Sequence, residues 1–211
     1  MNKTPRMLEL SPGHAFGLGQ QMAGDNQANR TILDQYELAY IDLREYDVLL
    51  MTDFIDQEYL YLNKHKIEAF LDEGKMVIFC GHLFRQWLPG CAPFMPKRIQ
   101  SHKDYHVVVT EQNGIFAGVE MNDMVYNKGV AGFFARGYHP APKGAEVLLT
   151  FEDGKPITYI DRDSTNGTIL VHAGRSLFQY SGQNKTTDRI GTQVWQWVVS
   201  ECNQLKGEKV Q

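Results

Sequence analysis

Apolar runs separated by polar loops predict the strands of an α/β protein. Residues 6–10 form a short apolar run that ends in a Ser-Pro-Gly turn, which predicts a first strand followed by a loop. Residues 38–42 and 47–52 are two further apolar runs with acidic ends, as expected of parallel strands that are buried on both faces. Residues 13–30 are rich in Gly, Gln and Asn and are expected to form a long loop with at most a short helix.

From residue 56 onward the hydrophobic period changes from that of a strand to that of a helix. Apolar side chains recur on one helical face, namely Leu60, Ile67, Phe70 and Leu71. Gly74 is suited to the left-handed cap at the end of a helix of about four turns. Residues 75–80 then resume the strand pattern and stop at Gly81. This strand, helix, strand order is a βαβ crossover, which places helices on the faces of a parallel sheet.

The second half of the chain has a different texture, with short apolar runs punctuated by Gly and Pro. The runs 105–110, 144–151, 156–161 and 168–172 predict hairpins appended to the parallel sheet. A final helix is expected after a cap at Thr186 or Thr187, with a core-facing stripe of Ile190, Val194, Trp197 and Val198. The pattern therefore predicts a three-layer α/β sandwich with a mainly parallel, doubly wound, flavodoxin-like sheet and appended β-hairpins. No repeat or linker divides residues 1–211, so a single domain is expected.

Composition and charge narrow the classes of partner and compartment. The formal net charge is −4 and the pI is about 6.0, and no basic run is dense enough to track a phosphate backbone, so no nucleic-acid partner is expected. The three cysteines lack CxxC spacing, which argues against a disulfide framework and a structural zinc site and favours a reducing compartment. No stretch has the length of a membrane span or the apolar core of a signal peptide, so a cytoplasmic protein without a membrane partner is expected.

Two segments resemble a known superfamily. Residues 46–82 begin with a Tyr-Asp pair and an apolar strand, continue with a helix, and end with a strand that stops at a glycine turn. This order resembles the middle of the class I glutamine amidotransferase-like proteins. Residues 156–178, followed by a helix with Trp195 and Trp197, are similar to the C-terminal part of its non-amidotransferase branches, the trehalose-utilisation-type proteins and β-galactosidase trimerisation domains. The resemblance implies a flavodoxin-like fold.

The resemblance also directs attention to a cysteine. Active members of the superfamily carry a nucleophile on a G-x-C-x-G elbow, whose tight turn leaves no room for large side chains, and complete a triad with a distant His-x-Glu. Here Cys80 is flanked two residues away by Ile78 and His82, which are both bulky. His172 is nearest to the family's catalytic histidine, but Gly174 stands where the glutamate is expected. These departures predict a protein without glutaminase activity.

The candidate binding residues follow predicted strands, because the carboxyl ends of parallel strands form the crevice in which open α/β sheets bind ligands. They are Gly13, His14, Gly81 and Arg175, and the candidate catalytic residues are Cys80, His82 and His172. No metal-ligand cluster or nucleotide fingerprint is recognisable, so no metal and no tightly bound cofactor are expected.

Three functional classes remain open. The favoured one is a non-catalytic amidotransferase-like domain that binds a small molecule or a protein partner. The first alternative is a Cys-dependent hydrolase or amidotransferase in which Cys80 acts with His82 or His172. The second is an oligomerisation domain, with a second copy of the chain as its partner.

Overall fold

The computed structural model describes residues 4–13, 29–110, 114–126, 131–132 and 134–208. Within them, the main sheet has eight strands in the order β2-β1-β3-β4-β10-β9-β8-β6. The strand bounds are β1 Met7–Ser11, β2 Arg30–Asp34, β3 Val48–Met51, β4 Met76–Cys80, β6 Val107–Val109, β8 Glu146–Phe151, β9 Pro156–Asp161 and β10 Thr168–His172. The pairings from β2 to β10 are parallel, and those among β10, β9, β8 and β6 are antiparallel.

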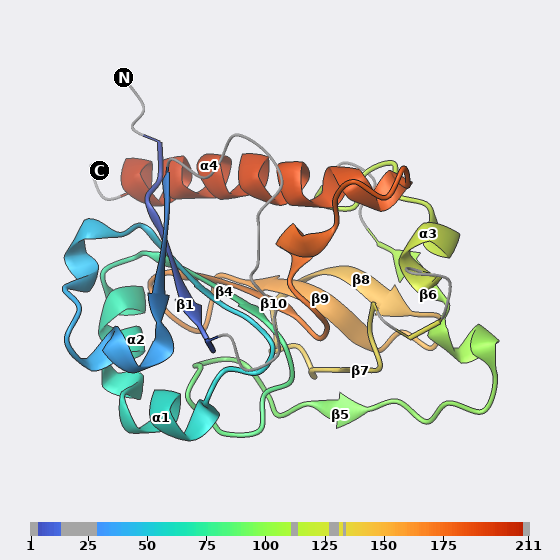
Figure 1. Ribbon diagram of the computed structural model, residues 1–211, viewed down its shortest axis with the longest axis horizontal. Coiled ribbons are helices and arrows are strands. Elements are labelled where there is room, and N and C mark those ends of the chain that lie inside the picture. The colour runs from blue at the N-terminus through green and yellow to red at the C-terminus, as the bar shows by residue number, and fades with distance from the viewer. Residues whose placement is uncertain (1–3, 14–28, 111–113, 127–130, 133, 209–211) are drawn as a thin grey trace.

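Helices cover both faces of this sheet. Helices α1 (Gln57–Leu62) and α2 (Lys64–Asp72) lie on one side and the long α4 (Ile190–Glu208) lies along the other (Figure 1). Every residue of β3 and β4 is buried, because successive side chains point to opposite faces and both faces are covered. In β4, Val77 and Phe79 belong to the α1–α2 core, whereas Met76, Ile78 and Cys80 belong to the α4 core. The predicted three-layer, mainly parallel sandwich with added antiparallel strands is therefore confirmed.

The remaining elements are short. They are a small helix α3 (Met121–Val125), a two-stranded sheet of β5 (Met95–Pro96) and β7 (Gly137–Tyr138), and five 3₁₀ turns in the described residues, η2 (Gln35–Ala39), η3 (Leu43–Glu45), η4 (His102–Tyr105), η6 (Leu177–Gln179) and η7 (Thr186–Arg189). In the part of the chain that the structure describes, no helix combines the length and the apolar character that crossing a bilayer requires.

The strand predicted at residues 38–42 is wrong. Residues Gln35–Ala39 form η2 instead, and the strand at this side of the sheet is β2. The Asp34 carboxylate caps η2 by accepting a hydrogen bond from the Tyr36 amide at 2.9 Å. Leu38 is buried while Tyr40 is largely exposed, so the short apolar run has a helical rather than an extended pattern of burial.

The helix predicted after residue 56 exists but is interrupted at Asn63, which separates α1 from α2. Asp56 caps α1 by accepting hydrogen bonds from the amides of Glu58 and Tyr59, both at 3.0 Å. Gly74 has a φ of 67°, so the predicted left-handed cap is confirmed. Sequence periodicity indicated a single helix because the two halves present the same apolar face to the sheet.

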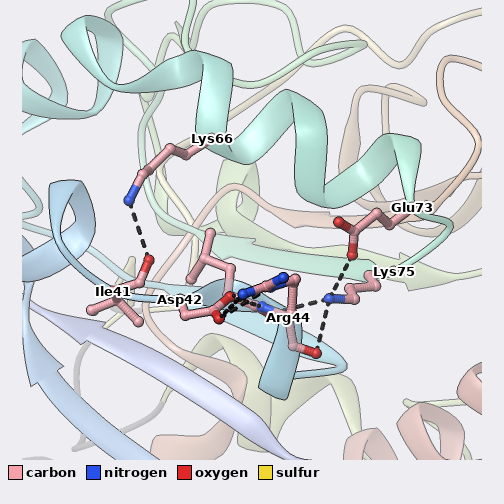
Figure 2. Close-up of polar contacts among 7 residues, drawn as sticks. Ile41, Asp42, Arg44, Lys66, Glu73 and Lys75 are labelled. Carbon is pink, nitrogen blue, oxygen red and sulfur yellow. Dashed lines mark hydrogen bonds and ion pairs between the residues drawn. The ribbon is translucent and has the colours of Figure 1, made fainter.

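The connection between β2 and β3 contains 3₁₀ turns in place of a covering helix. The side chains of Lys66 in α2 and Lys75 before β4 form hydrogen bonds to it (Figure 2). Lys66 of α2 donates hydrogen bonds to backbone carbonyls that include those of Ala39 at 2.6 Å and Ile41 at 3.2 Å. Lys75, just before β4, donates to the Leu43 carbonyl at 3.1 Å and forms an ion pair with Glu73 at 2.8 Å. These bonds give hydrogen-bond donors to backbone carbonyls in the 3₁₀ turns and in the loop between them.

The final helix follows its predicted stripe with one correction. Ile190, Val194 and Val198 are fully buried, as expected of an α4 face packed on the sheet. Trp197 is only half-buried, and Trp195 is the tryptophan that belongs to the core. The expected threonine cap is not formed, because Thr186 and Thr187 lie inside η7.

Candidate ligand-binding site

A cavity of about 590 Å³ lies at the carboxyl edge of β3, β4 and β10. Open α/β sheets bind ligands beyond the carboxyl ends of their strands. The order of the sheet reverses between β1 and β3, and the cavity lies to the β3 side of that point. Among the described residues, four segments line the cavity. They are Thr52, Asp53, Phe54, Ile55 and Gln57 after β3, Phe79, His82 and Phe84 at and after the end of β4, Gly132, Phe134, Ala135 and Arg136 before β7, and Gly174 and Arg175 after β10.

An ion pair provides the charge in the cavity. Arg175 Nε donates to Asp53 Oδ2 at 3.3 Å, and the two side chains are 28% and 17% exposed. Neither terminal nitrogen of the Arg175 guanidinium makes a hydrogen bond to another described residue. Burial raises the pKa of Asp53, and the neighbouring Arg175 opposes this shift without cancelling it. The pair therefore leaves part of the arginine fork open toward the cavity.

Aromatic rings form much of the wall. Phe54 is 57% exposed and Phe84 is 69% exposed, although both are large apolar side chains. The φ of Phe54 is 70°, in the left-handed region that bulky residues rarely occupy. His82 stacks on Phe94 with ring centroids 3.7 Å apart. Exposed aromatic rings, one of them on a strained backbone, are features that concentrate at binding sites.

Gln57 at the start of α1 positions the loop that carries His82 and Phe84. Its Nε2 donates to the His82 carbonyl at 2.6 Å, and its Oε1 accepts from the Phe84 amide at 2.7 Å. Burial, assisted by the nearby His139, lowers the pKa of His82. Its imidazole is therefore predominantly neutral at neutral pH.

Cys80 lies beneath the cavity and outside its described lining. It is the last residue of β4 and its side chain is fully buried in the α4 core. A hydrogen bond from the backbone of Leu177 favours the thiolate, but burial outweighs it and raises the pKa of Cys80 to about 12. The thiol therefore stays protonated at neutral pH.

His172 is the register partner of Cys80 in the adjacent strand β10 and is also fully buried. Its Nδ1 lies 2.7 Å from Thr158 Oγ1 in β9, on the side away from β4. The Phe134 ring meets the imidazole edge-on at 5.2 Å. Burial lowers the pKa of His172 to about 3, with smaller contributions from His139 and His82. The imidazole therefore lies beside the thiol-bearing strand β4, but its hydrogen bond is to Thr158 in β9, the strand on the other side of β10.

The backbone around Gly174 leaves no room for a side chain. Residues Ala135 and Gly174 form an antiparallel bridge that holds the segment before β7 against the end of β10. A Cβ atom at residue 174 would overlap the Phe134 carbonyl oxygen and approach His172 Nε2 to 2.7 Å. A glutamate would therefore displace one wall of the cavity.

The other candidate residues are divided between the cavity and its surroundings. The Gly81 amide donates to the His172 carbonyl at 2.9 Å, and a Cβ at Gly81 would press on the Phe79 ring at 3.2 Å. Gly13, with a φ of 85°, bonds to Ser11 Oγ at the end of β1 and is not in the described lining. His14 lies outside the described residues.

The structure thus brings two of the candidate residues, His82 and Arg175, into the cavity. Asp53, Phe54, Phe134 and Arg136 also line the cavity and are not among the candidate site residues that the sequence indicates. Asp53 directly follows the predicted strand at residues 47–52, and the rule that selected His82 would also have selected it. In the described residues, no group of three or more His, Cys, Asp or Glu side chains is arranged to hold a metal ion.

No protein-family model matches the chain, and no curated protein sequence matches it. Solved structures do resemble it. A glutamine amidotransferase from Thermotoga maritima matches with a TM-score of 0.53 and 14% identity over 99% of this chain and 87% of that one. The exo-β-1,4-mannosidase Op5Man5 from Opitutaceae bacterium strain TAV5 matches with a TM-score of 0.52 and 12% identity over 93% of this chain, which spans 36% of the mannosidase. At these identities the likeness concerns the fold alone, and the chain has an α/β fold like that of the glutamine amidotransferase.

Proposed function

We propose that this chain is a small-molecule-binding protein that keeps the amidotransferase fold without its cysteine chemistry. The observation that carries the proposal is the separation of the thiol from the cavity. Cys80 lies in the α4 core while the cavity above the strand ends holds Arg175, Asp53 and two exposed phenyl rings. A cavity of about 590 Å³ is within the range of small-molecule sites, and a few polar groups in an apolar wall are their usual composition.

The chemistry of Cys80 supports a role other than catalysis. A cysteine attacks as the thiolate, and a pKa of about 12 leaves a thiolate fraction of about 10⁻⁵ at pH 7. The nearby base is weak, because burial lowers the pKa of His172 to about 3. Ile78, His82 and Gly174 replace the small residues and the glutamate of active members, and we place the chain beside the non-amidotransferase branches of the superfamily on these positions.

The binding proposal is tested by protein-observed NMR with a mixed fragment library. We expect fragments to shift the amide resonances of Gly132, Gly174 and Arg175 together, and we expect Arg175→Met to weaken binding of the polar hits. Arg44→Met removes an exposed arginine at the opposite edge of the sheet and is the matched control. Shifts scattered over the surface, with none at the cavity, would contradict the proposal.

The catalytic alternative, in which Cys80 acts with His82 or His172, is tested by ammonia release from glutamine. We expect no turnover from the wild-type chain. Turnover that is present in the wild type and abolished in Cys80→Ser would establish the alternative and refute the proposed function.

A further inference from the structure

We propose that the ligand of this cavity is a planar aromatic anion, with Arg175 as the anchor for its anionic group and Phe54 and Phe84 as the surfaces that its ring covers. The inference rests on the proposed function and specifies the class of ligand. Two sources share this chemistry, the aromatic carboxylic acids and the nucleoside monophosphates.

The charges of the lining select an anion. The described lining contains two arginines, Arg136 and Arg175, and one acidic residue, Asp53. Its positive charges therefore outnumber its negative charge. Arg175 Nε donates to Asp53 Oδ2 at 3.3 Å, which leaves the terminal N–H groups of Arg175 to donate to a second oxyanion. A planar guanidinium fork matches the paired oxygens of a carboxylate or a phosphate. A cationic ligand would meet two like charges at the same wall.

Arg136 provides the second cation from the rim. Its Nε donates to the Gly132 carbonyl at 3.2 Å, which orients the exposed side chain along the edge of the cavity. The bridge between Ala135 and Gly174 holds this segment beside Arg175. A ligand with its anionic group on Arg175 therefore also experiences the field of Arg136.

The aromatic residues of the lining favour a ligand with a flat, apolar ring. Phe54 and Phe84 come from the loops after two neighbouring strands and are both exposed where they line the same cavity. Aromatic rings pair with other rings through offset stacking or edge contacts, which an aliphatic chain cannot supply. The left-handed backbone of Phe54 is a conformation that persists at sites where the side chain is needed in one position.

The wild-type chain alone provides the first test, by isothermal titration calorimetry. The probes are 2-naphthoate, its neutral analogue 2-naphthamide, the non-aromatic anion cyclohexanecarboxylate, and the pair AMP and adenosine. We expect at least one aromatic anion to bind about 10-fold tighter than its neutral partner, the ratio that one charge-assisted contact of about 1.4 kcal/mol provides. We expect it also to bind about 10-fold tighter than cyclohexanecarboxylate, which carries the same charge but has no aromatic ring to stack. Preference for naphthoate identifies a carboxylate site and preference for AMP identifies a phosphate site.

Variants assign the contacts. Arg175→Met is expected to reduce the affinity for the preferred anion about 10-fold and to leave the affinity for its neutral partner within about 2-fold, with Arg44→Met unchanged. Phe84→Ala is expected to weaken the aromatic probes selectively, whereas Leu62→Ala removes an exposed apolar side chain outside the cavity lining and is its control.

The outcomes separate the two proposals. If library fragments shift the cavity resonances but the neutral partners bind as tightly as the anions, the ligand class is wrong and the binding function stands. If cyclohexanecarboxylate equals naphthoate, the aromatic part of the inference is wrong. If no probe and no fragment perturbs the cavity, the proposed function itself fails.

Discussion

Arg175, in the loop after β10, contacts Asp53, in the loop after β3, with 3.3 Å between Nε and Oδ2 across 122 residues of sequence. The pair closes the carboxyl edge of the sheet over β4, the strand between them, and it lies above the fully buried Cys80. The two charged side chains at this edge therefore come from two loops that are close together only in the folded chain.

Asp53→Asn tests the raised pKa of this carboxyl. Because burial raises the pKa in the folded chain above the ordinary value of 3.8, the stability associated with the neutral carboxyl is fully present below that value and is lost as pH rises through the folded pKa. We therefore expect the free energy of unfolding of the variant, relative to wild type, to increase between pH 3.5 and pH 7. Urea unfolding at both pH values measures this, with the exposed Asp72→Asn as control. An unchanged difference would contradict it.

The thiols are expected to be unreactive in the native state. Cys80, Cys91 and Cys202 are free and buried, and burial raises the pKa of each to about 12. At pH 8 the thiolate fraction is then about 10⁻⁴, so reaction with a disulfide reagent should require unfolding. We expect three thiols to react in guanidinium chloride and none within minutes in buffer. Rapid native labelling that Cys80→Ser removes would show that the cysteine is exposed and activated.

His172 should make the chain sensitive to acid. Its pKa is lowered from 6.5 to about 3 by burial, so the stability it contributes is present above pH 6.5 and is lost as pH falls toward 3. Wild type should lose up to ~1.4 kcal/mol per pH unit below 6.5 relative to His172→Gln. Urea unfolding at pH 7.5, 6 and 5 tests this, and the exposed His65→Gln is the control. Parallel curves for wild type and His172→Gln would refute it.

The two tryptophans of α4 are expected to differ in their contribution to stability. Trp195 belongs to the core, so Trp195→Ala should cost about 3–5 kcal/mol through lost burial and a cavity. Trp197 is half-buried beside a polar groove, and Trp197→Ala should cost about 1–2 kcal/mol. Denaturant unfolding of both variants decides the order. Equal losses would show that Trp197 also packs in the core.

The fold was predictable where burial is complete. All residues of β3 and β4 are buried, so their apolar runs stand out in the sequence. The strand β2 was missed because it is at the edge of the sheet, where Ile32 and Asp34 are exposed and the polar residues Arg30, Thr31 and Asp34 break the apolar pattern. The pattern of β2 is weak and a short apolar run follows it, so the strand was predicted at residues 38–42 instead of at Arg30–Asp34.

The candidate site was predictable only in part, for a related reason. The rule that ligands bind beyond the carboxyl ends of strands selected His82 and Arg175, because strand ends are visible in the sequence. Phe134 and Arg136 reach the cavity through the bridge between Ala135 and Gly174. That bridge joins segments that are distant in the sequence and produces no local periodicity, so it cannot be predicted from the pattern of residues along the chain.

The place of β10 in the sheet also has a consequence for how the chain is made. Strand β4 leaves the ribosome early, but the strand that pairs with its free side follows roughly ninety residues later, which is about 5–20 s of translation. Until then Met76–Cys80, wholly interior in the finished protein, presents an unpaired strand edge to other nascent chains. A chaperone that shields this segment would therefore matter most between the synthesis of β4 and that of β10.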